Sequence, residues 1–415
     1  MHTQLYRKYL HILFVFFSFV TTALGQVPTI SSFSTTSGAA GSSVTITGNN
    51  FNTTLANNVV WFGGVRATVT AASATSLTVT VPVGLESETV VRILNTATKL
   101  IGESKQVFNL TFPVKALATS NYAAIVNFAG LANNSSDGIA VGDLDGDGKT
   151  EVVVATDGGS GTGSLILYRN TATPGIINAS SFNTNVSLST RRISGVRMAD
   201  FNGDGKLDIV VSMQVPEEIG ILENQSTGVG NFSFGTIVVI ALPAGGANRV
   251  NDVEVADIDG DGKIDIVSSN QIGSASQMIS VFRNVYTSGA ILTTSFTRTD
   301  LTGVFSQPQQ IDVGDIDNDG KPDIVASTNQ GTINIFENNS TSGTISFSAF
   351  ASRNVTAGVS RSIAIADFDG DGLNDIAIST TTTLNIDIFI NTNTVPGTLS
   401  FPTSPALTIT GLAGM

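Results

Sequence analysis

Apolar and polar residues alternate with a period of two over most of this 415-residue chain, and this alternation predicts β-strands. From about residue 114 onwards, five short segments share one pattern, in which apolar residues stand four and two positions before an aspartate. These pairs are Ile139/Val141, Val196/Met198, Val253/Val255, Ile311/Val313 and Ile363/Ile365. A second apolar segment follows each aspartate, at residues 152–154, 209–211, 266–267, 324–325 and 376–378. Each unit therefore begins with two strands joined by a short loop.

Each unit continues with two more predicted strands. The third ends at an asparagine, which is Asn170, Asn224, Asn284, Asn338 or Asn391. The fourth begins near a phenylalanine, which is Phe182, Phe234, Phe296, Phe347 or Phe401. Four strands in each of five similar units predict a β-propeller, because stacked blades bury the sheet faces that a single blade leaves exposed.

The last unit stops where another first strand is expected. Residues 391–415 parallel residues 338–361, after which the following unit begins. We therefore expect the sequence to be a fragment with about five blades present. Residues 114–136 resemble a fourth strand, which we expect to pair with a last blade and close the ring. Whether five blades close by themselves stays open at this point.

Residues 27–112 form a separate block of short alternating segments between Gly and Asn turns. This pattern predicts a small antiparallel β-sandwich, with Trp61 in its core. The block resembles the IPT/TIG family of immunoglobulin-like modules, which are found on cell surfaces. The resemblance implies a spacer or adhesive module and not an enzyme.

The aspartates open five acidic loops, which start at Asp143, Asp200, Asp257, Asp315 and Asp367. Each loop has oxygen-bearing side chains at positions 1, 3, 5 and 9 and a glycine at position 6. With a carbonyl at position 7, this set suits Ca²⁺, which takes about six to eight oxygen ligands, better than Mg²⁺ with its stricter octahedral geometry. An EF-hand is excluded, because position 12 carries no carboxylate: it is Val154, Val211, Ser268, Ala326 or Ile378.

The loops and their flanking strands resemble FG-GAP/VCBS repeats, the blades of integrin-α-type propellers, over roughly residues 114–415. Complete propellers of that family usually have about seven blades. The resemblance implies about five structural Ca²⁺ ions, held by Asp143, Asp145, Asp147, Lys149 and Glu151; Asp200, Asn202, Asp204, Lys206 and Asp208; Asp257, Asp259, Asp261, Lys263 and Asp265; Asp315, Asp317, Asp319, Lys321 and Asp323; and Asp367, Asp369, Asp371, Leu373 and Asp375. The position-7 residues would contribute only their carbonyls. Because Asn202 replaces a carboxylate with a neutral oxygen, the second site is expected to be the weakest.

The first 25 residues predict a cleaved signal peptide. Arg7 and Lys8 precede an apolar run that continues through Val20, and small residues follow at 23–25. The alternative is an uncleaved membrane anchor, but the run is short for a bilayer. No second apolar stretch of membrane length follows, so we expect a secreted or cell-surface protein without a transmembrane span.

Composition narrows the chemistry of the mature chain. Both histidines lie within residues 1–25 and there is no cysteine, which excludes histidine-based triads, thiol nucleophiles and the usual zinc sites. Removing residues 1–25 takes away two basic groups and no acid, so the net charge changes from −13 to −15, and five Ca²⁺ ions would bring it to −5. So negative a chain disfavours nucleic acid and anionic membranes as partners.

Two functions fit these observations. The first is an extracellular calcium-binding scaffold for adhesion or ligand binding, with a protein or glycan partner. The second is an extracellular polysaccharide-active enzyme, a lyase or hydrolase, built on a calcium-stabilised propeller. We favour the first and expect no catalytic residues, because the loops account for 19 of the 33 acids and no acid pair outside them stands out.

Overall fold

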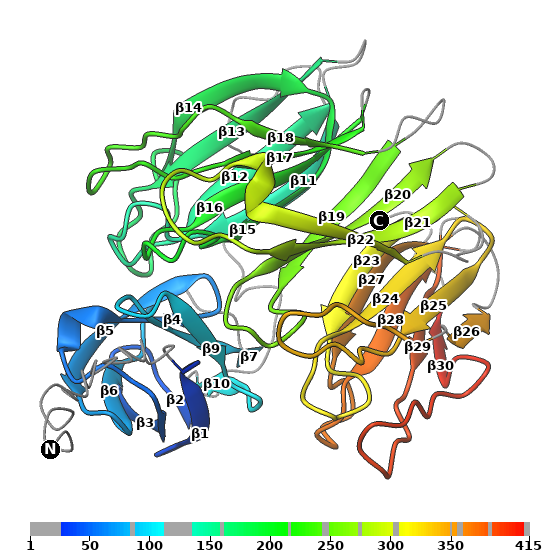
Figure 1. The fold of residues 1–415 in the computed structure, drawn as a ribbon, viewed down its shortest axis with the longest axis horizontal. Helices are drawn as coiled ribbons and strands as arrows, with labels where there is room; N and C mark the ends of the chain where they lie inside the picture. Colours follow the sequence, from blue (N-terminus) through cyan, green and yellow to red (C-terminus); the bar gives the residue numbers. More distant parts are fainter. Residues whose placement is uncertain are drawn as a thin grey trace, which may run out of the picture.

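The computed structural model describes residues 26–83, 88–111, 135–157, 162–214, 217–242, 249–272, 276–301, 307–348, 351–354, 360–380 and 384–410. It shows an all-β protein, in which an N-terminal domain precedes a propeller of five four-stranded sheets (Figure 1). The predicted signal peptide lies outside the described residues, as do residues 114–134 of the segment predicted to close the ring. The last two residues of that segment begin the first strand of the first blade.

The N-terminal domain is a β-sheet that curves over its own core. Its strands are β1 (Thr29–Phe33), β2 (Ser37–Gly38), β3 (Ser43–Asn49), β4 (Asn58–Phe62), β5 (Val65–Ala72), β6 (Ser76–Thr80), β7 (Glu88–Thr89), β8 (Val91–Asn95), β9 (Leu100–Glu103) and β10 (Phe108–Leu110), with a 3-10 helix at Leu55–Asn57. Seven strands follow the order β1-β3-β6-β5-β4-β8-β9, and β2-β10-β7 cover the other side. The buried Phe108 meets Phe62 and Phe33 edge to face, with ring centres 5.1 and 6.0 Å apart.

Each propeller blade is an antiparallel sheet whose strands pair in chain order. Blade one has β11 (Ser135–Gly142), β12 (Glu151–Asp157), β13 (Thr162–Asn170) and β14 (Phe182–Arg191); blade two has β15 (Ile193–Ala199), β16 (Asp208–Met213), β17 (Glu218–Leu222) and β18 (Val238–Ala241); blade three has β19 (Arg249–Ala256), β20 (Asp265–Ile272), β21 (Ser276–Asn284) and β22 (Phe296–Leu301). Blade four has β23 (Pro308–Gly314), β24 (Asp323–Thr328), β25 (Thr332–Phe336) and β26 (Ala351–Asn354); blade five has β27 (Ser360–Ala366), β28 (Asp375–Thr380), β29 (Ile386–Phe389) and β30 (Leu407–Ile409). A 3-10 turn at Thr293–Ser295 precedes β22.

The predicted strand limits hold for the first two strands of every blade and partly for the others. In blade two the third strand ends at Leu222, and Asn224 instead forms an isolated bridge with Phe234 before β18 begins. Blade four repeats this arrangement with Asn338 and Phe347. In these two blades the asparagine therefore lies beyond the end of the third strand, contrary to the prediction, and it pairs with the phenylalanine through an isolated bridge.

Consecutive blades are joined by the asparagine that follows the third strand. The side chain of Asn224 donates to the carbonyl of Leu207 in its own blade (3.0 Å) and to that of Leu144 in the preceding blade (2.9 Å). The equivalent bonds to a preceding blade are Asn284 to Phe201, Asn338 to Ile258 and Asn391 to Ile316. These four asparagines are buried, so each bond is made away from water.

Among the described residues, no further blade covers the outer side of the first blade or of the last blade. Ile139 and Val141 of β11 are 62% and 49% exposed, whereas Val196 at the equivalent place in β15 is fully buried. At the other end Phe368 is 46% exposed, although its counterpart Phe201 is 3% exposed. Within the described residues, each end of the five-blade array therefore has exposed apolar side chains.

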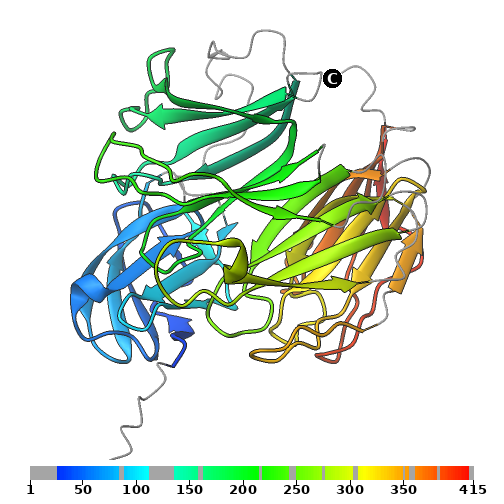
Figure 2. The same cartoon turned by 45° about the horizontal axis from the view of Figure 1, so that its top comes forward.

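The N-terminal domain is packed against the propeller, contrary to the expectation that it is a spacer (Figure 2). All five residues of β4 are buried, because the strand has apolar neighbours on both faces. Val60 and Phe62 belong to the domain's own core, whereas Val59 and Trp61 belong to a cluster shared with the second and third blades. Trp61 is therefore buried as predicted, but in the contact between domains and not in the core of the sandwich.

The asparagine links predict a difference between two alanine substitutions. N284A leaves the buried carbonyls of Phe201 and Ile264 without their donor, which costs about 1–3 kcal/mol for each. N170A is the matched control, because Asn170 is less buried and its side chain donates to the carbonyl of Thr150 in its own blade. Thermal unfolding should show a clearly lower midpoint for N284A than for N170A. Equal midpoints would show that the bond between blades does not stabilise the array.

Candidate metal centres

Each acidic loop joins the first and second strands of a blade and closes around its first aspartate. In the first loop, Asp143 Oδ1 accepts from Gly146 N (2.8 Å) and Oδ2 accepts from Gly148 N (2.9 Å). Gly148 can turn toward Asp143 because it has a φ of 82°, in the region that favours glycine. The glycine at position 6 donates to the aspartate at position 1 in all five loops.

The acid at position 9 is the buried centre of each loop. Asp265 is fully buried, and it accepts from Ile258 N at position 2 (2.9 Å) and from the backbone N–H of Asn284 (2.7 Å). The other four loops repeat both contacts, around Glu151, Asp208, Asp323 and Asp375. The same asparagines that join the blades therefore also hold the position-9 carboxylates.

The structure brings the predicted ligands together in four of the five loops. In those loops three carboxylates offer oxygens within 4.8 Å of one another. The groups are Asp143, Asp145 and Glu151; Asp257, Asp259 and Asp265; Asp315, Asp317 and Asp323; and Asp367, Asp369 and Asp371. The second loop has Asn202 at position 3 and does not form such a carboxylate group.

Burial makes these carboxylates costly to ionise beside one another. Burial, together with the neighbouring aspartates, raises the pKa of Asp143 to about 6 and that of Glu151 to about 8, although backbone N–H donors partly offset the rise. Burial likewise raises the pKa of Asp265 to about 8 and that of Asp323 to about 7. A bound cation would offset this cost by stabilising the ionised forms.

The fourth loop has buried oxygens without a hydrogen-bond donor. Asp317 Oδ1 accepts from Asp319 N (3.0 Å), but Asp317 Oδ2 and Asp315 Oδ1 are buried and have no hydrogen-bond partner. Buried carboxylate oxygens are rarely left unpaired, because the loss of their hydration is not compensated. These atoms are placed where a cation would bind, so the residues fit an oxygen-liganded metal ion.

Position 7 was predicted to contribute only a carbonyl, and the lysine side chains there contact other groups. Lys263 Nζ donates to the carbonyl of Tyr286 (2.8 Å), and Lys321 Nζ lies 3.1 Å from Asp319 Oδ2. Their amide N–H groups donate to the position-5 aspartate, as Lys149 N does to Asp147 Oδ1 (2.9 Å).

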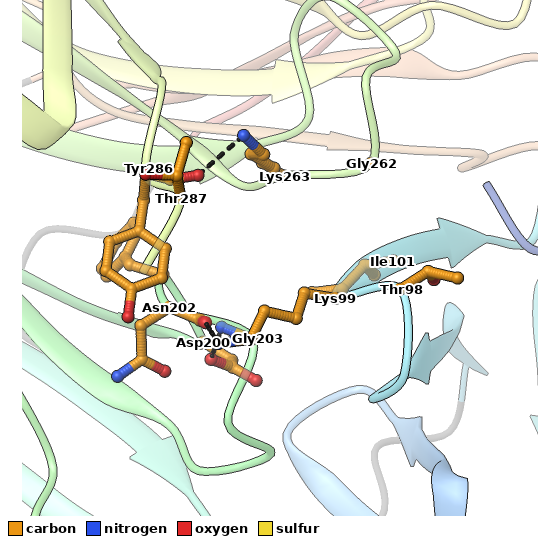
Figure 3. Close-up of a pocket in the computed structure, with 11 residues that line it drawn as sticks. Thr98, Lys99, Ile101, Asp200, Asn202, Gly203, Gly262, Lys263, Tyr286 and Thr287 are labelled. Carbon is orange, nitrogen blue, oxygen red and sulfur yellow. Dashed lines mark hydrogen bonds between the residues drawn. The ribbon is translucent and has the colours of Figure 1, made fainter. Parts of the chain in front are cut away.

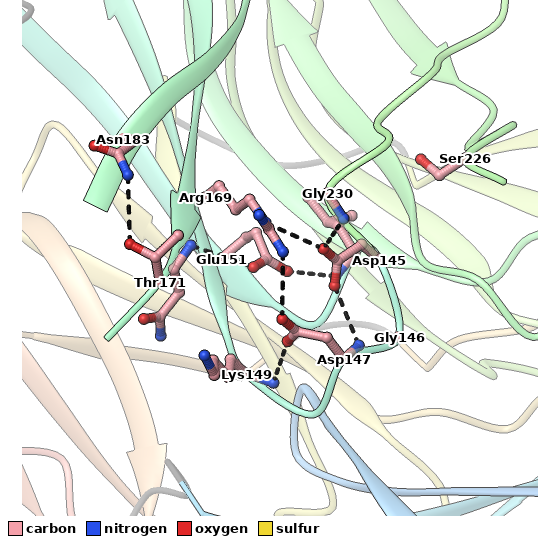
Figure 4. A network of polar contacts seen from close by, with 12 residues as sticks. Asp145, Gly146, Asp147, Lys149, Glu151, Arg169, Thr171, Asn183, Ser226 and Gly230 are labelled. Atoms are coloured by element: carbon pink, nitrogen blue, oxygen red, sulfur yellow. Dashed lines mark hydrogen bonds and ion pairs between the residues drawn. The ribbon is translucent and has the colours of Figure 1, made fainter. Parts of the chain in front are cut away.

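Two arginines contact the loops and were not predicted from the sequence. Arg169 Nε lies 3.5 Å from Asp145 Oδ2, and Arg169 Nη2 lies 3.8 Å from Asp147 Oδ2 (Figure 4). Arg283 makes the equivalent contacts with Asp259 and Asp261 in the third loop. Both precede the third-strand asparagine directly, which is the one local signal that could have identified them.

The N-terminal domain rests on the loops of the first three blades. Asp143 N donates to the carbonyl of Gly64 (3.0 Å), and Ile101 N donates to the carbonyl of Gly262 (2.7 Å). Lys99 Nζ donates to the carbonyl of Asn202 (3.3 Å). The interface between the domains is therefore built on the loop backbone.

A cavity of about 200 Å³ lies between the N-terminal domain and the second and third loops of the propeller (Figure 3). Lys99 lies on one wall, with its Nζ 5.5 Å from the centre of the Tyr286 ring. Lys263 lies on the same cavity and is bonded to Tyr286, as described above. Both lysines therefore interact with other residues that line the cavity. Because these residues come from both domains, the cavity is part of the interface between the domains.

Comparisons with known families agree with this architecture. A model of the FG-GAP-like repeat matches residues 143–211 and 315–378, and a model of the IPT/TIG domain matches residues 28–112. The chain carries an IPT/TIG domain followed by FG-GAP-like repeats. The repeat matches lie in blades one and two and in blades four and five, and blade three has the same four-stranded sheet. The domain that rests on the loops is the IPT/TIG domain.

Solved structures give only a distant likeness. An auxiliary nutrient binding protein from Bacteroides thetaiotaomicron is 15% identical, with 91% of this chain and 85% of that chain covered and a TM-score of 0.35. A protein of the same description from Bacteroides ovatus is 13% identical, with 85% of this chain and 95% of that chain covered and a TM-score of 0.25. Both TM-scores are below 0.5, so neither structure informs the function of this chain. No curated protein matched the sequence. Within the described residues, no helix is long and apolar enough to cross a membrane.

Proposed function

We propose that this protein is a secreted or cell-surface scaffold that binds an extracellular protein or glycan, and that Ca²⁺ at its FG-GAP-like loops stabilises it. The observation that carries the metal assignment is the pair of buried, unpaired oxygens on Asp315 and Asp317. The first and third loops group the same three positions, 1, 3 and 9, and the fifth loop groups positions 1, 3 and 5. Such all-oxygen sites suit a hard cation with a flexible coordination number, which describes Ca²⁺ better than Zn²⁺ or Mg²⁺.

The ions would stabilise the folded propeller and would not take part in catalysis. The position-9 carboxylate of each loop is bonded to the asparagine that, in blades two to five, also bonds the preceding blade. Holding that carboxylate ionised and in place therefore stabilises both the hairpin and the contact between blades. If Ca²⁺ binds the folded chain and not the unfolded chain, each site would raise the free energy of unfolding by about 2.7 kcal/mol when the Ca²⁺ concentration is 100 times the Kd of that site.

Binding to a macromolecule fits the remaining surface better than catalysis does. The mature residues have no histidine or cysteine to serve as base or nucleophile. The carboxylate groups of four loops belong to the proposed metal sites. Outside the loops, the buried Asp252 and the half-buried Glu254 lie beside Arg197 and form ion pairs with it. A rigid propeller with a domain fixed to one side offers broad surfaces, which suits recognition of a large partner.

A substitution in the fourth loop tests the metal assignment, because it should lower the melting temperature with Ca²⁺ but not in chelator. In D317N, the remaining side-chain oxygen can still accept from Asp319 N, while the unpaired Oδ2 is replaced by a neutral NH₂. In chelator the variant should melt at or above the wild-type temperature, because a buried charge is removed. With Ca²⁺ it should melt lower than the wild type. A wild-type melting temperature that is the same in Ca²⁺ and in chelator would contradict the assignment.

Trp61 reports on the joint between the domains, because it is the only tryptophan and is 4% exposed. The IPT/TIG domain is bonded to the loop backbone, so release of Ca²⁺ should loosen the joint and expose the indole. We expect a red shift of the Trp61 emission on chelation, which Ca²⁺ reverses. The D317N variant is the control, since the fourth loop makes none of the three loop-backbone hydrogen bonds described above and its loss should leave most of the shift intact. Emission that stays blue in chelator would show that docking is independent of the metal.

The binding function is tested with arrays of glycans and of extracellular matrix proteins, probed with Ca²⁺ and with chelator. We expect selective binding that is lost in chelator at a temperature where the scaffold loosens. The same preparations are incubated with soluble polysaccharides, and released products are measured. Product release without selective retention would favour the polysaccharide-active enzyme instead.

A further inference from the structure

In blades one to three, the residue before the third-strand asparagine contacts position 3 of the loop, and its charge differs between these blades. In blades one and three it is Arg169 or Arg283, and each arginine contacts the aspartates at positions 3 and 5. In blade two it is Glu223, and position 3 is Asn202. The second blade has therefore exchanged the charge of both partners.

Asn202 and Glu223 are in direct contact. Asn202 Nδ2 donates to Glu223 Oε1 (3.1 Å), and Asn202 Oδ1 accepts from Asp204 N (3.0 Å). The corresponding oxygen of Asp145 in the first loop, Oδ1, accepts from Asp147 N (3.1 Å). Because Glu223 accepts from the NH₂ group, it holds the amide with its oxygen in the place of the Asp145 oxygen and prevents the opposite orientation.

Glu223 also replaces a contact between blades. In the first and third loops the second oxygen of the position-3 aspartate accepts an N–H from the next blade: Gly230 N to Asp145 (2.6 Å) and Gly343 N to Asp259 (2.8 Å). Asn202 has no second oxygen to offer. At the same junction, the N–H of Ile291 in the third blade donates to Glu223 Oε2 (3.5 Å).

The exchange changes the charge around the second loop. The first loop has four carboxylates and Arg169, which give −4 + 1 = −3, whereas the second has three carboxylates and Glu223, which give −3 − 1 = −4. Both loops also have a lysine at position 7 and one basic side chain of the N-terminal domain beside them, Arg66 at the first loop and Lys99 at the second, so these charges cancel in the comparison. The neutral Asn202 therefore does not leave the second site with the least negative charge.

We propose that Glu223 is a positioning residue of the second metal site: it fixes the orientation of Asn202 and supplies the charge that Asn202 lacks. This proposal rests on the proposed calcium binding. It replaces the expectation from the sequence that the second site is the weakest, and it places the affinity of the second site at or above that of the first and third sites.

Position-6 glycines allow each loop to be followed separately. The amides of Gly148, Gly205 and Gly262 each donate to the position-1 aspartate of their own loop. In protein labelled with ¹⁵N-glycine, the shift of each amide during a Ca²⁺ titration reports the affinity of that one loop. Gly205 reads the second site, and Gly148 and Gly262 are internal controls.

Three variants test the proposal. E223Q should weaken Ca²⁺ binding to the second site, followed at the Gly205 amide, by roughly tenfold, because a nearby negative charge is removed. E223R should weaken it by roughly a hundredfold, because that charge is reversed. N202D/E223R copies the arrangement of the first loop, with −4 + 1 = −3, and should restore an affinity close to that at Gly148. A variant that merely misfolds would not be rescued by an added acid.

The titration distinguishes the proposed calcium binding from the proposed role of Glu223. If no glycine amide responds to Ca²⁺, the proposed calcium binding is wrong. If Gly148 and Gly262 respond as before but E223Q leaves the affinity at Gly205 within twofold of the wild type, Glu223 has no role in the site. Failure of N202D/E223R to improve on E223R would also overturn the proposal, since it would show that the two residues are not coupled.

Discussion

The structure depends on one buried hydrogen-bonded group that is repeated in every blade: the position-9 carboxylate and the asparagine that donates to it. Asp265 is fully buried, and a carboxylate in that position is stable only if its oxygens are satisfied. Asn284 donates its backbone N–H to Asp265 and its side-chain NH₂ to carbonyls in two blades. The loop, the hairpin and the neighbouring blade are thus stabilised together, and disturbing any one of them leaves buried polar groups unpaired in the others.

The same repeat explains how the IPT/TIG domain is held. Tightly turned loops direct backbone groups away from their centre, and the domain bonds to those groups through Gly64, Lys99 and Ile101. Its strand β4 then contributes Val59 and Trp61 to the apolar cluster beside them. Since the domain is hydrogen-bonded to the loops of three successive blades, it stabilises their relative positions as well as its own. The domain is therefore better described as a part that stabilises the propeller than as a spacer.

The strands and the loops could be predicted from the sequence because each depends on residues close together in the chain. Alternating apolar positions predicted β15, a short continuous apolar run predicted β16, and nine consecutive residues defined each loop. The contacts between blades could not be predicted in this way: Asn224 and Leu144 are 80 positions apart, and nothing near Asn224 indicates its partner. Trp61 shows the same limit, because its alternation with Val60 and Phe62 indicates that it lies on the other face of β4 but not that a second domain covers that face.

Under the proposed role of Glu223, the nine residues of the second loop do not by themselves determine its affinity for the metal. Its nine residues include one carboxylate fewer than the other loops, and the sequence therefore predicts a weak site. The compensating group, Glu223, lies 21 positions from Asn202 on another strand, and the matching residue in the first and third loops is an arginine that reduces their charge. Because electrostatic energy depends on all charges within several ångströms, the affinity of a loop is a property of the blade and not of the motif. The third-strand position beside the asparagine should therefore be considered together with the loop whenever such repeats are compared.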